Sequence, residues 1–218
     1  MKSLFIGINY QYTNNTNIKV LKNAVKDAKR AYRYIKFNYP DTSVKILTDV
    51  AKFHSNYFDN SMLIYPSREN IIRALEWLND DVMFLHISSH ALPEGIVPAD
   101  YKSDRDLINL QEFIYQKKGQ LLFCVLDTCH SAALLNLSFK KEFVVCINSC
   151  TSSEKSNDAE SFSKDLYSFI NNKFLIFKKS KKSWADVVKF MKEYNDPRQS
   201  PHLISSKGVP LEKNIFEI

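Results

Sequence analysis

Glycine is scarce in this sequence, and its scarcity excludes two common nucleotide-binding motifs. The 218 residues include only four glycines, which lie far apart at Gly7, Gly95, Gly119 and Gly208. The phosphate-binding loop G-x-x-x-x-G-K-[ST] and the dinucleotide-binding motif G-x-G-x-x-G both need glycines within a short segment. Neither motif can be present, so nucleotide-binding domains of these two kinds are excluded.

Cysteine is equally scarce, and long apolar runs are absent. The four cysteines, Cys124, Cys129, Cys146 and Cys150, form neither a C-x-x-C pair nor the paired spacing of a zinc finger. A disulfide framework is unexpected in a chain of this length with 44% hydrophobic residues. Residues 4–8 are too short an apolar stretch for a signal peptide, and no segment approaches the roughly 20 apolar residues of a membrane-spanning helix. We predict free thiols, no membrane partner and a cytoplasmic location.

Acidic residues are fewer than basic ones. The chain has 30 Lys and Arg against 24 Asp and Glu, which gives a net charge of +6. A basic protein can attract acidic partners. The lysines, however, are spread along predicted helices and no nucleic-acid-binding motif occurs, so we predict no nucleic-acid partner.

Apolar runs alternate with helical periodicity along the chain. Strands are predicted at 4–9, 43–48, 82–88, 121–126, 143–147 and 202–205, and helices at 20–35, 67–78, 110–117, 159–170 and 184–194. Such alternation is typical of an α/β fold, and continuously apolar strands indicate a sheet covered on both faces. We predict a three-layer sandwich in which helices flank a mostly parallel central sheet of about six strands.

Two of the predicted strands run directly into polar residues that carry chemistry. One strand leads into Ser88, Ser89 and His90, and the next leads into Asp127 and Cys129. Neighbouring parallel strands end at the same edge of a sheet, so a thiol and an imidazole would face one cleft. This pair is the minimum for a cysteine peptidase. The residues alone leave open that Cys129 is an inert thiol and His90 a turn residue.

Two other sites can be weighed from the same residues. His86 and His90 lie four apart on one strand face, but no third ligand accompanies them, so packing of His86 is favoured over a metal site. Ser88 or Ser89 could be a nucleophile, yet no G-x-S-x-G elbow is present. We therefore predict no metal site and no serine nucleophile.

The sequence resembles the metacaspases of the caspase-like superfamily. Residues 84–91 (FLHISSHA) are similar to the family's F-h-H-Y-S-G-H-G, where h is apolar, and residues 127–132 (DTCHSA) are similar to its D-S-C-H-S-G. Further similar segments occur in family order over nearly the whole chain, at 4–10, 23–28, 66–71, 96–101 and 199–206. The resemblance implies one caspase-like catalytic domain over 1–218. This domain would consist of a large-subunit-like part at about 1–140 and a small-subunit-like part at about 141–218. The first strand begins at residue 4, so we expect no prodomain.

The resemblance also implies roles for individual residues. Cys129 would be the nucleophile and His90 its partner, and the backbone N–H groups of Ala91 and Cys129 would stabilise the oxyanion. The implied activity is that of a monomeric cysteine endopeptidase that cleaves protein or peptide substrates after Arg or Lys. A carboxylate pair matches the donors of a guanidinium group, which suits such a specificity. The implied pocket for the basic side chain is formed by Asp27, Asp127, Ser88 and Asp158.

Glycines that the family has beside both catalytic residues are replaced here. Ser89 and Ala91 flank His90, and Ala132 follows Ser131. A side chain disfavours a positive φ, so we expect the loop that forms the oxyanion hole to be distorted or reshaped. The alternative function is a catalytically weak caspase-like module that binds substrates or regulates a related peptidase.

Acidic segments that make many metacaspases calcium-dependent are mostly missing. The loop after His90 is only residues 92–95, and Asp100, Asp104 and Asp106 are more typical of solvated loop carboxylates. Calcium needs six to eight oxygen ligands. We predict no calcium requirement and no other cofactor.

A basic segment separates the two subunit-like parts of the match. Solvated loops often have this composition. An enzyme that cleaves after Lys could also cleave itself there. The candidate autocleavage positions are Lys178, Lys179, Lys181 and Lys182.

Overall fold

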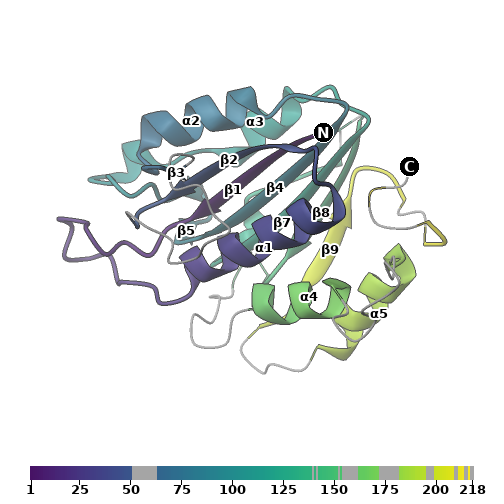
Figure 1. Cartoon of the computed structure of the whole chain (residues 1–218). Coiled ribbons are helices and arrows are strands. Elements are labelled where there is room, and N and C mark those ends of the chain that lie inside the picture. Colours follow the sequence, from purple (N-terminus) through teal and green to yellow (C-terminus); the bar gives the residue numbers. More distant parts are fainter. Residues whose placement is uncertain are drawn as a thin grey trace.

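A computed structural model of the chain has a central seven-stranded sheet (Figure 1). The structure describes residues 1–50, 63–138, 140, 142–151, 153, 162–171, 182–194, 199–208, 211–213 and 216. The strand order is β3-β2-β1-β4-β7-β8-β9, and every neighbouring pair is parallel except β8 and β9. The strands are β1 (Lys2–Gly7), β2 (Ser43–Thr48), β3 (Leu63–Ile64), β4 (Val82–Ser89), β7 (Leu121–Thr128), β8 (Phe143–Asn148) and β9 (His202–Ser205).

Helices cover both faces of this sheet, which confirms the predicted three-layer sandwich. Helices α2 (Arg68–Trp77) and α3 (Leu110–Tyr115) lie on one face. Helices α1 (Ala24–Asn38), α4 (Phe162–Asn171) and α5 (Trp184–Glu193) lie on the other (Figure 1). No described helix is long and apolar enough to cross a membrane.

The strands feed two separate cores because successive side chains point to opposite faces. On β1, Leu4 and Ile6 join an aliphatic core beneath α2 and α3, whereas Phe5 joins the core beneath α1, α4 and α5. That second core is rich in aromatic rings, among them Phe84 and Trp184. Burial on both faces explains why the strands read as continuous apolar runs.

Close packing fixes where α1 starts relative to the sheet edge. A Cβ on Gly7 would lie 2.6 Å from the carbonyl oxygen of Ala24 and 2.8 Å from the Cβ of Ala28. Only glycine at the end of β1 permits this approach. The first turns of α1, which include Asp27, are thereby held beside the ends of β1 and β4.

The structure differs from the sequence prediction in the first strand, which is β1 (Lys2–Gly7) instead of 4–9, and in several other elements. It adds the two-residue edge strand β3, and a small hairpin, β5 (Ala91–Leu92) and β6 (Gly95–Ile96), directly after His90. It also starts the first helix at Ala24 instead of residue 20. The reason is local: Leu21 donates its N–H to the carbonyl of Asn9 (2.9 Å), which holds the preceding segment against the loop after β1.

Candidate active site

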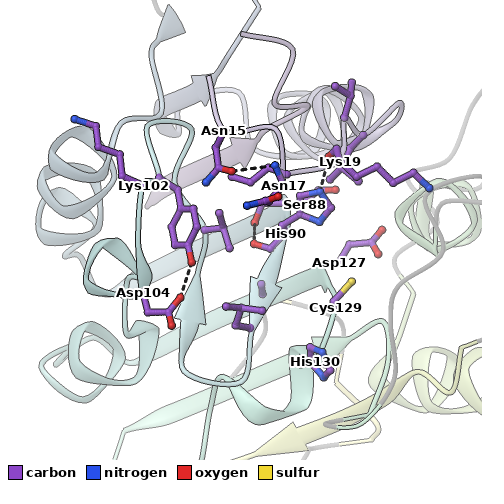
Figure 2. A pocket seen from close by; sticks show the side chains of 18 of the residues that line it. Asn15, Asn17, Lys19, Ser88, His90, Lys102, Asp104, Asp127, Cys129 and His130 are labelled. Atoms are coloured by element: carbon purple, nitrogen blue, oxygen red, sulfur yellow. Dashed lines mark hydrogen bonds between the residues drawn. The ribbon is translucent and has the colours of Figure 1, made fainter. Parts of the chain in front are cut away.

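The sheet brings His90 and Cys129 to one edge. Strands β4 and β7 are parallel neighbours whose last paired residues are Ser88 with Asp127 and Ser89 with Thr128. His90 and Cys129 are therefore the next residues on adjacent strands. Both line a single cavity of about 1050 Å³ (Figure 2). The expectation that these two side chains share a cleft agrees with this geometry.

His90 is oriented by a backbone carbonyl and by an aromatic ring. Its Nε2 lies 2.6 Å from the carbonyl oxygen of Lys19, in the loop after β1. A carbonyl only accepts hydrogen bonds, so Nε2 carries the proton. The ring of Tyr10 stacks on the imidazole with centroids 4.8 Å apart.

Tyr10 also anchors the backbone around His90. Its hydroxyl accepts the N–H of His90 (3.0 Å) and donates to the carbonyl of Val97 (2.6 Å). Burial raises the pKa of Tyr10 well above its usual value, so the hydroxyl remains a donor. The sequence analysis missed this residue as part of the site.

A buried carboxylate holds the loop that carries Tyr10. Asp49, just after β2, accepts the backbone N–H groups of Asn9 (2.9 Å) and Gln11 (3.1 Å) through its two oxygens. Tyr10 lies between them with a positive φ of 60°, a conformation that costs a non-glycine residue free energy. Asp49 was also missed, because a lone aspartate after a strand resembles an ordinary turn residue.

Cys129 is followed by a turn that is tied to the neighbouring strand. His130 adopts a left-handed conformation with a φ of 53°. Buried Ser131 donates its hydroxyl to the carbonyl of Cys150 (2.9 Å) and accepts the N–H of Cys150 (3.2 Å), which lies just after β8. The thiol of Cys150 donates to the carbonyl of Thr128 (3.1 Å). Cys129 is the only one of the four cysteines that is not buried.

The residues that replace glycine beside His90 and Cys129 have ordinary backbone conformations. Ser89, Ala91 and Ala132 are not among the described residues with a positive φ, which are Tyr10, His130 and Phe216. The backbone at these three positions therefore has conformations that a side chain permits.

In the hairpin after His90, the backbone N–H of Ala91 points away from the partner strand. Leu92 pairs with Gly95 across a two-residue loop, and Val97 donates to the carbonyl of His90 (3.1 Å). The intervening pair, Ala91 with Ile96, is then of the non-hydrogen-bonded kind. Its N–H groups point away from the partner strand, which leaves the N–H of Ala91 directed outside the hairpin.

Two buried carboxylates line the same cavity. Asp27 is 2% exposed, Asp127 is 6% exposed, and Ser88 is buried beside them. Asp127 Oδ2 accepts the N–H of Ser163 (2.9 Å) in the first turn of α4, where the helix dipole favours a negative charge. Asp27 Oδ1 pairs with Arg30 (2.6 Å) on α1. Burial raises the pKa of the Tyr167 hydroxyl, and the negative charges of Asp127 and Asp27 raise it further. The cavity therefore has an acidic end that suits a cation.

Several expected site residues cannot be placed beside this pocket. Asp158, Lys178, Lys179 and Lys181 lie outside the described residues. Lys182 is described, and its Nζ lies 4.7 Å from the centroid of the Phe169 ring. It does not line the cavity that holds His90 and Cys129.

The described aspartates after His90 accept hydrogen bonds from nearby donors. Asp100 accepts the N–H of Arg68 (2.8 Å), and Asp104 accepts the hydroxyl of Tyr101 (2.5 Å). Asp106 accepts two backbone N–H groups in a capping box. Within the described part of the chain, no three His, Cys, Asp or Glu side chains are grouped as metal ligands.

Comparison with known proteins assigns the architecture and the family. A crystal structure of a Geobacter sulfurreducens protein superposes with a TM-score of 0.66 at 15% sequence identity. The match covers 99% of this chain and 98% of that one, which shows a shared fold.

Curated relatives are metacaspases. The chain is 30% identical over 190 residues to metacaspase-5 of Trypanosoma brucei brucei, with 77% of this chain covered. It is 26% identical over 162 residues to metacaspase-1 of Saccharomyces cerevisiae, with 63% of this chain covered. Each match spans only 35% of the relative's length. The family model described as metacaspase, peptidase C14 domain matches residues 1–138. By this match over more than half of its length, the chain belongs to the metacaspase family of cysteine peptidases.

Proposed function

We propose that this chain is a cysteine endopeptidase in which Cys129 is the nucleophile and His90 the general acid and base. One observation carries the proposal: His90 and Cys129 follow adjacent strands and line one cavity that also contains two buried carboxylates. The family supports peptide bonds of proteins as the substrate class.

The reaction follows from the positions of these groups. A free thiol has a pKa near 8.5, so the proton of Cys129 passes to His90 Nδ1 to form the thiolate. The sulfur attacks the carbonyl carbon, and the oxyanion accepts hydrogen bonds from the N–H groups of Ala91 and Cys129. When the C–N bond breaks, His90 gives its proton to the departing amine. Water, deprotonated by His90, then hydrolyses the thioester and releases the acid product.

The carbonyl of Lys19 stabilises the charged intermediate of His90. Its oxygen lies 2.6 Å from Nε2, so it accepts a charge-assisted hydrogen bond when the ring is an imidazolium. In this role the carbonyl replaces the carboxylate that orients histidine in many hydrolases.

The acidic end of the cavity supports cleavage after Arg or Lys. Asp27 and Asp127 are buried near Cys129, so an arginine or lysine side chain there gains a charge-assisted hydrogen bond, whereas an acidic side chain is repelled. Arg30 neutralises part of the charge of Asp27, which makes Asp127 the principal partner of the substrate cation.

We further propose that the enzyme acts as a monomer, without calcium, in the reducing cytoplasm. Asp104 and Asp106 are already bonded to donors of their own segment, and Asp100 is bonded to the N–H of Arg68 at the start of α2, which supports calcium independence. Sedimentation of the purified protein tests the monomer. Fractionation of the source cells tests the location.

Fluorogenic peptides that end in Arg, Lys or Asp test the activity. They are incubated with the protein under reducing conditions without calcium, and a Cys129→Ala variant is the matched control. We expect release after Arg and Lys, none after Asp, and at least a thousandfold loss in the control. No cleavage of any peptide, with intact binding of peptides to both proteins, would instead support the regulatory module.

A further inference from the structure

The backbone carbonyl of Thr128 accepts hydrogen bonds from two side chains that directly follow β8. Thr128 is the last residue of β7, and β7 lies between β4 and β8 in the sheet (Figure 1). The thiol of Cys150 donates to this carbonyl (3.1 Å), and the hydroxyl of Ser149 donates to it over a longer distance (3.4 Å). All three residues are fully buried, so both bonds form away from water.

This carbonyl belongs to the same peptide group as the N–H of Cys129. A trans peptide is planar, so its C=O and its N–H point in opposite directions. The donors to the Thr128 carbonyl come from the β8 side, so the N–H of Cys129 points to the β4 side. His90 and Ala91 follow β4 on that side of the sheet. The side chains after β8 therefore direct the N–H that the proposed reaction uses to stabilise the oxyanion.

The segment that carries both donors is fixed to the nucleophile strand by its backbone. Ser149 donates its N–H to the carbonyl of Leu126 (2.9 Å), which continues the ladder between β7 and β8. Beyond the nucleophile, the hydroxyl of Ser131 bonds both the carbonyl (2.9 Å) and the N–H (3.2 Å) of Cys150. The thiol of Cys150 is thus placed by contacts with residues before and after Cys129.

A donor to a carbonyl acts on the N–H of the same peptide in two ways. It fixes the direction of the N–H, and it polarises the peptide so that the N–H becomes a stronger donor. Oriented backbone donors stabilise an oxyanion because they need no reorganisation during the reaction. We propose that Cys150, assisted by Ser149, is a positioning residue that holds the N–H of Cys129 toward the oxyanion. This inference rests on the proposed peptidase function and deepens it.

Two substitutions of Cys150 and one matched control test this role. Cys150→Ala removes the thiol, whereas Cys150→Ser keeps a hydrogen-bond donor at the same position. Cys146→Ala removes another buried thiol, which lies within β8 and donates to the side chain of Asn148 (3.4 Å) instead of to the Thr128 carbonyl. Cleavage of an Arg-aminocoumarin reporter gives kcat and KM for the wild type and for each variant.

The expected result is a loss of kcat that the serine variant reverses. A tetrahedral oxyanion forms both when Cys129 is acylated and when the thioester is hydrolysed, so kcat falls whichever step is limiting. Loss of an entire oxyanion donor costs about 10²–10³ in kcat, and here the donor remains but is held less firmly, so we expect about a tenfold fall in Cys150→Ala. KM should change little, because the interaction forms in the transition state. We expect kcat to recover in Cys150→Ser and to keep its wild-type value in Cys146→Ala.

Alkylation by iodoacetamide separates this role from a general effect on the nucleophile or on the fold. In that reaction the sulfur of Cys129 bonds a saturated carbon as iodide leaves, and the thiol proton passes to His90, so no oxyanion forms. The other cysteines are buried, so the rate in the native protein reports Cys129. We expect the rate in Cys150→Ala to stay within about twofold of the wild type, because thiolate formation is unaffected. A parallel fall in alkylation and kcat would show that Cys150 supports the thiolate or the fold, which overturns the inference.

The same assays separate this inference from the proposed function. A wild-type protein that does not cleave the reporter overturns both. A wild-type protein that cleaves it, with an unchanged kcat in Cys150→Ala or an equal loss in Cys150→Ser, overturns the inference alone and leaves the peptidase in place. A loss in Cys146→Ala as large as that in Cys150→Ala would also overturn it, because removal of any buried thiol near β8 would then have the same effect.

Discussion

The two halves of the dyad are held in different ways. His90 is positioned by contacts from far along the chain: the Lys19 carbonyl 71 residues away and the Tyr10 hydroxyl 80 residues away. Cys129 is held by a buried strand end and by Ser131, two residues on, which bonds the backbone of Cys150. The proposed nucleophile is thus held by its own strand end and by the segment after β8, whereas the histidine depends on the loop after β1.

The largest effect expected of a substitution outside the proposed dyad concerns the acidic pocket near Cys129. Asp127→Asn removes the charge of a buried carboxylate that accepts the N–H of Ser163. Loss of one partner of a buried charge pair costs about 2–5 kcal/mol, so we expect kcat/KM for Arg peptides to fall by about a hundredfold. The measurement is kcat/KM for paired Arg and uncharged peptides.

A carboxylate on α4, the helix whose Ser163 N–H is bonded to Asp127, provides the control. Asp165 is exposed in the first turn of α4, so Asp165→Asn makes the same chemical change outside the cavity. An equal loss in both variants would show that helix stability, rather than the pocket, is responsible.

The next effect tests the histidine side. Tyr10→Phe keeps the ring that stacks on His90 but removes the hydroxyl bonds to His90 and Val97. An unsatisfied buried group costs about 1–3 kcal/mol, so we expect kcat to fall roughly tenfold and the pH profile of kcat to shift. Tyr10→Leu loses the ring as well and should fall further. A lowered melting temperature with an unchanged kcat and pH profile would show that Tyr10 is only structural.

A smaller effect concerns His86, the buried histidine of β4. His86 lies on β4 in the core, where its Nδ1 bonds the hydroxyl of Tyr167 (3.0 Å), and burial lowers its pKa to about 3. The unfolded chain binds a proton at His86 below about pH 6.5 and the folded chain does not. As the pH is lowered from about 6.5 to about 3, His86 therefore reduces the free energy of unfolding by about 1.4 kcal/mol per pH unit.

Urea unfolding of His86→Gln at pH 7 and pH 4.5 checks this sign. We expect the variant to lose less stability than the wild type on acidification. Parallel losses in the two proteins would mean that His86 is protonated without unfolding.

The smallest expected effect concerns calcium. Asp100, Asp104 and Asp106 are bonded to donors of their own or an adjacent segment, so chelation should change kcat/KM by less than twofold, within the error of such an assay. Activity is compared in a chelator and in added calcium. An absolute dependence on calcium would show that residues after His90 rearrange to bind it.

The sequence predicts those parts of the fold and site that depend on periodicity and motif. Alternating apolar runs and helices suffice to predict a mostly parallel sheet covered by helices, but not the order of its strands. Ser67 caps α2 and accepts the N–H of Asn70. The hairpin after His90 escaped prediction because its strands have two residues each. The orientation of His90 could not be predicted because the carbonyl that accepts its hydrogen bond belongs to the backbone and is independent of the residue type at Lys19. The role of Tyr10 in the site was not predicted, because an aromatic residue after an apolar strand is typical of the hydrophobic core.

The four thiols also differ in burial, and this difference allows the fraction of molecules with an accessible Cys129 to be measured. Cys124, Cys146 and Cys150 are buried, and Cys129 is half-buried in the cavity. Burial also raises the pKa of Cys146. A thiol reagent small enough to enter the cavity should therefore label one site in the native protein and four after denaturation. The native stoichiometry then titrates the fraction of a preparation with an intact nucleophile, so that turnover can be stated per competent molecule.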